Sequence, residues 1–205
     1  TDVLNSPLSI ACSKKFYDIA KLLLKNNANV NIKCKIPPIH AADYSESIID
    51  LLIRYGVFID ELDSNGCTLL YNSCFRNNLN LIKKLIANGA NINFAKNNYS
   101  ILNVACSNGN YDIIKFLMNL NINNENLMPP LNTACAKGFL NIVELLVNDG
   151  ADINKISFDG SPLLIACHNE FFDIVKFLVK KNANINCVVN GTSPLMILCC
   201  NGNLD

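Results

Sequence analysis

The chain has 205 residues, of which half are apolar, and its 17 basic residues balance its 17 acidic ones. A neutral chain offers little attraction to a phosphate backbone, so nucleic acid is not an expected partner. The chain has no run of about 18 apolar residues, so a membrane-spanning helix is not expected. Its first residues do not resemble a secretory signal.

The predicted elements form a repeat of two short helices. Segment 161–186, SPLLIACHNEFFDIVKFLVKKNANIN, has apolar residues at helical spacing on both sides of a polar turn, and similar segments begin at residues 6 and 129. Weaker copies begin at 37, 68 and 100, and a partial one at 193. One column marks every copy at intervals of 29 to 32 residues: Ala11, Ala42, Ser73, Ala105, Ala134, Ala166 and Leu198. We expect one array over 1–205, with repeats at approximately 1–31, 32–62, 63–94, 95–125, 126–155, 156–187 and a partial repeat at 188–205.

All prolines and glycines fall at turns of this repeat. In every repeat except the third and fourth, proline stands where the first helix opens, and there its fixed φ suits the helix: Pro7, Pro37, Pro38, Pro129, Pro130, Pro162 and Pro194. Glycines stand where a left-handed residue is expected at the end of the first helix (Gly109, Gly138, Gly202), at the end of the second helix (Gly56, Gly89, Gly150), and in the linking hairpin (Gly66, Gly160, Gly191).

The first two repeats make specific predictions. In the first repeat, four residues of the first helix are expected to face inward: Leu8, Ile10, Ala11 and Cys12. The second helix carries apolar residues at helical spacing: Ile19, Leu22, Leu23 and Leu24. The second repeat has two residues fewer between its helices, which predicts a tighter turn at 43–46. Its Asp43 stands where the other repeats have cysteine. Because a buried unpaired carboxylate is costly, we expect Asp43 to reach solvent or to cap a backbone N–H.

Later repeats depart from the pattern at two places. Segment 119–126, NLNINNEN, is short and polar, which predicts a stunted hairpin with local twist or fraying. The seventh repeat ends at Asp205, where a second helix is due, so Leu195 and Cys199 are expected to lack a partner. A fragment of a longer array would explain these uncovered residues. Another domain or a second copy could instead cover them.

Six of the ten cysteines share one slot of the repeat: Cys12, Cys74, Cys106, Cys135, Cys167 and Cys199. Equivalent residues of stacked helices lie about 10 Å apart, too far for a disulfide. We therefore expect free thiols that fill one repeated gap, in a reducing compartment, cytoplasmic or nuclear. No C-x-x-C pair exists and there are only two histidines, so neither a metal nor another cofactor is expected.

A repeat of roughly 33 residues that opens T-P-L-H-x-A is the signature of the ankyrin repeat. Over nearly its whole length the chain resembles that family, as in 37–42 (PPIHAA) and 161–166 (SPLLIA). The resemblance implies an all-α ankyrin-repeat solenoid of helix–turn–helix units linked by β-hairpin loops. It also implies that His40 hydrogen-bonds turn backbone.

We find no catalytic constellation. The sequence has no G-x-S-x-G, H-E-x-x-H or P-loop motif. Asp18, Asp112 and Asp173 open second helices, where an acidic side chain favours the helix dipole. We expect a non-enzymatic chain without catalytic residues.

The resemblance implies a concave groove that binds other proteins, lined by hairpin tips and by the ends of the first helices. The candidate contact residues in those slots are Ile36, Tyr44, Phe75, Arg76, Tyr99, Met128 and His168. Exposed aromatic, Arg and Met side chains are typical of interface hot spots. Alternatively, Phe75 and Tyr44 fold back to fill space left by the shortened turn of repeat two.

The sequence thus favours a protein-interaction scaffold that binds a protein or peptide partner. A structural spacer within a larger protein is the alternative. A third hypothesis, from the resemblance alone, is modification of the hairpin asparagines Asn31, Asn93, Asn154 and Asn186.

Overall fold

The computed structural model describes residues 5–120, 122 and 127–200. The chain divides into two compact units, unit 1 (residues 1–96) and unit 2 (residues 97–205). Unit 1 contains α1 (Pro7–Ser13), α2 (Tyr17–Lys25), α3 (Pro38–Ala41), α4 (Glu46–Arg54), α5 (Leu69–Phe75), α6 (Leu79–Ala87) and β1 (Ala95–Lys96). Unit 2 contains β2 (Tyr99–Ser100), α7 (Ile101–Ser107), α8 (Tyr111–Met118), α9 (Pro130–Lys137), α10 (Leu140–Asn148), α11 (Pro162–His168), α12 (Phe172–Lys180) and α13 (Pro194–Cys200).

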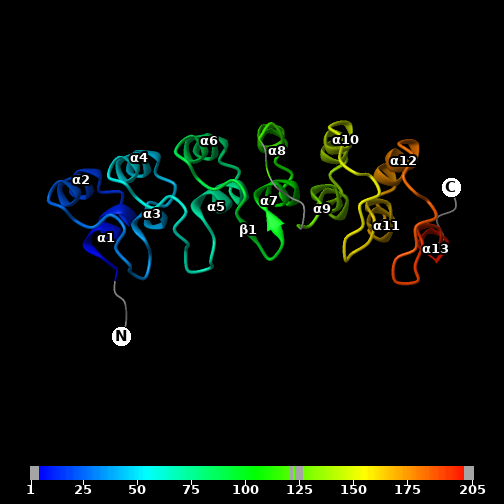
Figure 1. Ribbon diagram of the computed structural model, residues 1–205, viewed down its shortest axis with the longest axis horizontal. Coiled ribbons are helices and arrows are strands. Elements are labelled where there is room, and N and C mark those ends of the chain that lie inside the picture. The colour runs from blue at the N-terminus through cyan, green and yellow to red at the C-terminus, as the bar shows by residue number, and fades with distance from the viewer. Residues whose placement is uncertain (1–4, 121, 123–126, 201–205) are drawn as a thin grey trace. The chain divides into compact units, whose positions relative to one another are not determined.

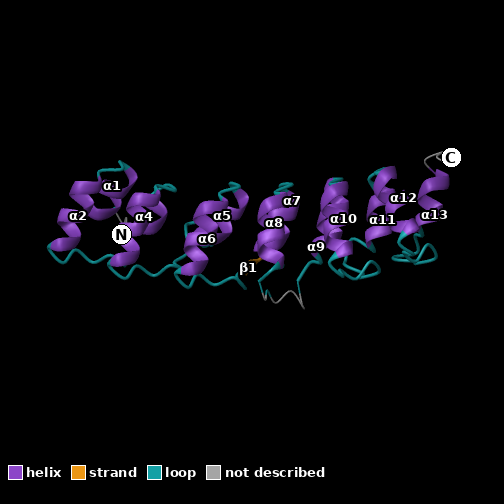
Figure 2. Cartoon of the chain, turned by 90° about the horizontal axis from the view of Figure 1, so that it is seen from above, coloured by secondary structure: helices purple, strands orange, loops and turns teal. Residues whose placement is uncertain are grey.

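The all-α fold of repeated helix pairs is confirmed. Each of the first six predicted repeats holds one helix pair, and 188–205 holds α13. Within each unit the first helices form one row and the second helices another (Figure 1). Seen from above, the loops that link one pair to the next lie along one edge of each unit (Figure 2). In unit 1, α1 packs on α3 and α2 on α4. In unit 2, α7, α9, α11 and α13 pack in succession, as do α8, α10 and α12.

The first helices start and stop through local backbone chemistry. Ser6 and Ser161 cap α1 and α11 by accepting the N–H groups of Ser9 and Leu164, and a proline follows each cap. At the other end, Gly138 follows α9 with φ 77°. A Cβ on Gly138 would lie 2.7 Å from the ring of Phe171, so both backbone and packing require glycine there.

The cysteine column fills the core as expected, with one exception. Its members are buried at Cys12, Cys74, Cys106, Cys135 and Cys167, and all ten cysteines of the chain are free. Burial raises the pKa of Cys12 to about 11 and that of Cys74 to about 12. The exception is Cys199, which is exposed, as expected for a last helix without a partner: α13 packs against α11 on one side, and no described residue covers the other.

One prediction for the first repeat is wrong. Ile10 is exposed, although Leu8 of the same helix is buried. In the second helix Ile19 and Leu22 are also exposed, whereas Leu24 is buried. The cause is the same as at Cys199. Helices α1 and α2 pack against α3 and α4 on one side, and no described residue covers the opposite side.

The tighter turn predicted for repeat two is wrong. Four residues separate α3 from α4, whereas three separate α1 from α2, and the missing residues instead shorten the first helix, which has 4 residues in α3 and 7 in α1. Two of the connecting residues, Asp43 and Tyr44, have left-handed φ values of 41° and 60°. Asp43 reaches solvent, 3.7 Å from Lys15 Nζ. The fraying predicted for 119–126 concerns mainly residues 121 and 123–126, which lie outside the described residues. Residues 201–205 also lie outside them. Within the described part of the chain, every helix is too short to cross a membrane.

Candidate functional site

Unit 1 has a hollow of about 480 Å³ beside the ends of its first helices, which we call the unit 1 hollow. Its lining residues are His40, Asp43, Tyr44, Asp63, Asn65, Leu69, Asn72, Phe75 and Arg76. Three of the predicted groove residues, Tyr44, Phe75 and Arg76, therefore meet here. They come from the turn between α3 and α4 and from the end of α5.

Phe75 is the exposed apolar feature of this hollow. It is the last residue of α5, and 64% of its surface is accessible. It therefore does not fold back to fill space. Tyr44 is half-buried, and the guanidinium carbon of Arg76 lies 4.5 Å from the centre of its ring, a cation–π contact. Burial raises the pKa of the Tyr44 phenol, with Arg76 opposing that shift.

The less exposed of the two acidic residues in this lining is fully hydrogen-bonded. Asp63 Oδ1 accepts the backbone N–H groups of Asn65 (2.8 Å) and Cys67 (2.9 Å), and Oδ2 accepts Asn72 Nδ2 (2.8 Å). Burial opposes ionisation of Asp63, but these donors outweigh it and hold its pKa below the usual range. Asp63 shapes the hairpin tip of repeat three and was not among the predicted site residues, although the sequence Asp63–Thr68 matches a hairpin.

His40 has the structural role expected of it. Its Nε2 donates to the carbonyl oxygen of Glu61 at 2.7 Å, which ties α3 to the next hairpin. Because a carbonyl can only accept, Nε2 carries a proton.

Unit 2 has a separate hollow of about 270 Å³, the unit 2 hollow. It is lined by Tyr99, Ser107, Met128, Asn132, Thr133, Ala136, Lys137 and Asp159. Tyr99 and Met128 were predicted for the groove. The exposure expected of Met128 is wrong, because it is only 6% accessible. Its N–H donates to Asn98 O (3.0 Å) and its carbonyl accepts Asn103 Nδ2 (2.9 Å), so its backbone is held against the start of α7.

The remaining two candidates line neither hollow. Ile36 is exposed in the loop before α3, and its N–H donates to Asn5 Oδ1 at 3.2 Å. His168 is exposed at the end of α11. Their part in a binding surface stays a prediction.

Two asparagines of unit 2 take the structural role of His40. Asn103 and Asn132 occupy the same repeat slot, and each donates from Nδ2 to a carbonyl of the following loop: Asn103 to Met128 O (2.9 Å), Asn132 to Gly160 O (2.9 Å). The sequence analysis missed both. Alignment of the repeats on the histidine slot could have found them.

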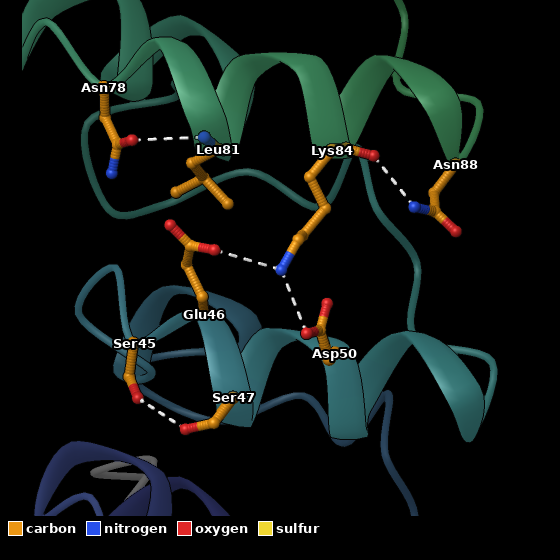
Figure 3. Close-up of polar contacts among 8 residues, drawn as sticks. All are labelled: Ser45, Glu46, Ser47, Asp50, Asn78, Leu81, Lys84 and Asn88. Carbon is orange, nitrogen blue, oxygen red and sulfur yellow. Dashed lines mark hydrogen bonds and ion pairs between the residues drawn. The ribbon is translucent and has the colours of Figure 1, made fainter.

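A polar cluster on α4 and α6 of unit 1 has a structural explanation (Figure 3). Lys84 Nζ lies 2.9 Å from Asp50 Oδ2 and 3.1 Å from Glu46 Oε2, and the hydrogen bond with Asp50 raises the pKa of Lys84. Asn78 caps α6 by accepting the N–H of Leu81 at 3.1 Å. These contacts join neighbouring second helices. Among the described residues, no group of three or more His, Cys, Asp or Glu side chains could hold a metal ion.

Comparisons with known proteins agree with this fold. The family model for ankyrin repeats in three copies matches residues 8–96, 39–127, 72–157 and 131–205. The ankyrin repeat domain of human ASB11 has a similar structure, with a TM-score of 0.79 at 23% identity, over 94% of this chain and 91% of that chain.

Three viral proteins are similar in sequence. Ankyrin repeat protein FPV031 of fowlpox virus (strain NVSL) is 28% identical over 55% of this chain and 36% of its own length. FPV222 of the same virus is 30% identical over 52% of this chain and 15% of its own length. OPG015 of monkeypox virus is 40% identical over 30% of this chain and 14% of its own length. The matches thus span little more than a third of these relatives at most.

Ankyrin repeats are generally protein–protein interaction modules. The matches to the family model together cover residues 8–205 without a gap, and helix pairs follow one another in both units. The chain therefore belongs to the ankyrin repeat family.

Proposed function

We propose that the chain is a non-catalytic interaction module that binds a protein partner on the concave side of its repeats, with Phe75 as the anchor in unit 1. The observation that carries this proposal is the exposure of Phe75 (64%) beside a hollow whose floor is already hydrogen-bonded. An exposed aromatic ring next to a stacked Arg–Tyr pair has the composition of an interface hot spot.

The chemistry of the hollow favours an apolar contact over a charged one. Asp63 has three donors and Arg76 lies over Tyr44, so neither group needs a partner to be stabilised. Burial of the Phe75 ring by an apolar side chain of the partner would supply most of the binding free energy. Because charges of both signs line the hollow, we expect the affinity to change little with salt.

The test compares two phenylalanines of equal exposure in the same unit. Phe75→Ala removes the proposed anchor, whereas Phe58→Ala removes a ring that is 63% exposed and does not line the hollow. Both variants are first checked for folding by circular dichroism. The wild-type chain and each variant then capture partners from a cell extract, and the affinity for a recovered protein is measured.

We expect Phe75→Ala to weaken binding about 30-fold, the size of a hot-spot loss, and Phe58→Ala to leave it unchanged. Equal capture by all three chains would refute the role of Phe75. That result would favour the spacer hypothesis or another surface.

We also infer that the chain works in a reducing compartment, in the cytoplasm or the nucleus. All ten cysteines are free, and burial raises the pKa of five of them, which suits thiols that stay reduced.

A further inference from the structure

The described part of the chain contains four Asn–Gly pairs: Asn65–Gly66, Asn88–Gly89, Asn108–Gly109 and Asn190–Gly191. In such a pair the backbone nitrogen of glycine can attack Cγ of the asparagine side chain, since glycine has no Cβ in the way. The nitrogen loses its proton, the bond from Cγ to Nδ2 breaks, and ammonia leaves behind a succinimide ring. Water then opens the ring at either carbonyl, which gives aspartate or isoaspartate. The net reaction consumes one water molecule and releases one ammonia molecule.

Two of the pairs end helices, and their hydrogen bonds hold the reacting groups apart. Asn88 Nδ2 donates to Lys84 O at 2.8 Å, so the side-chain amide is turned toward the preceding turn of α6 (Figure 3). The attacking nitrogen, that of Gly89, donates its hydrogen to Ile86 O at 3.0 Å. The same two bonds hold the pair after α7: Asn108 Nδ2 to Val104 O (2.9 Å) and Gly109 N–H to Cys106 O (3.3 Å).

The pair at the hairpin tip of repeat three is held through its backbone. Asn65 N–H donates to Asp63 Oδ1 at 2.8 Å, and Gly66 N–H donates to Asp63 O at 2.9 Å. Lys96 Nζ also donates to Asn65 O. The attacking nitrogen is therefore engaged here too, although no described residue holds the side-chain amide of Asn65.

The fourth pair, Asn190–Gly191, lacks these restraints. Both residues are exposed at the tip of a hairpin that Val189 and Thr192 close with two backbone hydrogen bonds of 3.0 Å. Neither the Asn190 side-chain amide nor the Gly191 N–H has a hydrogen-bond partner among the described residues. Apart from its chain neighbours, nothing lies within 4 Å of the place that a Cβ on Gly191 would take, so a ring has room to form.

We propose that Asn190 is a deamidation site of the folded chain, which passes through the succinimide faster than the other three asparagines. The product carries a carboxylate in place of a neutral amide. Its isoaspartyl form also adds a methylene group to the main chain between Val189 and Thr192, which disturbs the register of the two bonds that close the hairpin. Ser193 follows directly and accepts the N–H of Met196 at 3.3 Å, so the modification loosens the start of α13.

The test compares each pair with itself in the folded and the unfolded chain. The full chain is incubated at neutral pH with or without guanidinium chloride. Peptide mass spectrometry follows the mass increase from amide to carboxylate, and fragmentation of each peptide locates the modified residue. The ratio of the unfolded rate to the folded rate cancels the effect of the neighbouring residues in the sequence.

Two variants complete the design. Asn190→Gln keeps an amide at the hairpin tip but needs a larger ring for the same attack, so modification at this position should nearly stop. Asp63→Ala removes the side-chain acceptor of Asn65 N–H, so the folded rate at Asn65 should rise while the rate at Asn190 stays the same. Circular dichroism verifies that both variants fold.

We expect a ratio near unity at Asn190 and a ratio of about ten or more at Asn88 and Asn108, where local opening must first break two hydrogen bonds. In the isoaspartyl form, the amide of Thr192 should exchange its hydrogen faster than in the fresh chain. Equal ratios at all four pairs, slower reaction of Asn190 than of Asn88, an unchanged rate of Asn65 in Asp63→Ala, or unchanged exchange at Thr192 would each overturn the proposal. No binding partner takes part in the experiment, so such a failure would leave the proposal for Phe75 untouched.

Discussion

Replacing Asn103 and Asn132 by leucine should have very different effects on stability, although the two residues share one slot of the repeat. Asn103→Leu removes four hydrogen bonds, two from Ser100 and one each to Met128 O and Thr133 Oγ1. At about 1 kcal/mol each, these bonds contribute about 4 kcal/mol. The loss also leaves Ser100, a fully buried residue, without its acceptor.

Asn132→Leu removes much less. The two amide hydrogens account for about 2 kcal/mol of net hydrogen bonding. One of their acceptors, Gly160 O, keeps the N–H of Ser157 at 3.0 Å. The substitution also eliminates Asn132 Oδ1, a buried oxygen without a hydrogen-bond partner among the described residues. Its removal relieves a desolvation penalty of about 1–3 kcal/mol. The apolar gain from leucine is common to both variants and cancels in the comparison. Asn103→Leu should therefore be less stable than Asn132→Leu by at least about 3 kcal/mol.

Urea unfolding followed by far-ultraviolet circular dichroism measures this difference, provided that the dependence on urea is the same for both variants. Equal losses of stability, or a larger loss for Asn132→Leu, would refute the reasoning. Either result would mean that Asn132 Oδ1 is satisfied in solution by a donor, and that its buried position carries no penalty.

Three further outcomes are expected. Asp63→Ala should destabilise the chain by about 2 kcal/mol at neutral pH. The folded pKa of Asp63 is lowered, so its contribution to stability is present above the unfolded pKa of about 3.9 and is lost as the pH falls through the folded pKa. The free energies of unfolding of the wild-type chain and the variant, measured in urea, should therefore converge in acid. Lys84→Met should cost at most about 1 kcal/mol, since the ion pairs are partly exposed. The folded pKa of Lys84 is raised, so this contribution is present below about pH 10.4 and is lost as the pH rises through the folded value, and salt should reduce it. Finally, a thiol reagent should label the exposed Cys199 well before the buried Cys106, because burial raises the pKa of the Cys106 thiol. Peptide mass spectrometry measures the order of labelling, and earlier labelling of Cys106 would contradict its burial in the core.

Much of the fold was predictable from the sequence because the residues that start and end its helices act through their own backbone conformation. Pro7 and Pro162 open helices through their own fixed φ, and Gly138 ends one through its own left-handed backbone. The equivalent turn in other repeats is also left-handed, but at Lys15 and Glu170 (φ 59° and 58°), where no residue signal marks it. There the packing of the helix pair imposes the conformation against local preference.

The candidate site was less predictable because it depends on contacts between distant residues. The repeat slots placed Phe75 and Arg76 beside the hollow that they line. Met128 occupies the same slot as the exposed Ile36, just before the Ser/Thr position, yet Met128 is buried, and Asn103, 25 residues earlier in the chain, binds its carbonyl. No slot alignment contains that contact. Exposure in a repeat is thus decided by the neighbouring repeat as much as by the slot itself.

The capping slot decides whether a buried amide of the following turn is fully paired. Asn103 Oδ1 accepts the N–H and the hydroxyl of Ser100, the residue that caps α7. Pro129 stands in the same slot before α9 and offers neither donor, so Asn132 Oδ1 has no hydrogen-bond partner among the described residues. Two asparagines in one slot of the repeat therefore differ in their hydrogen bonding because of a single residue three positions earlier in each repeat.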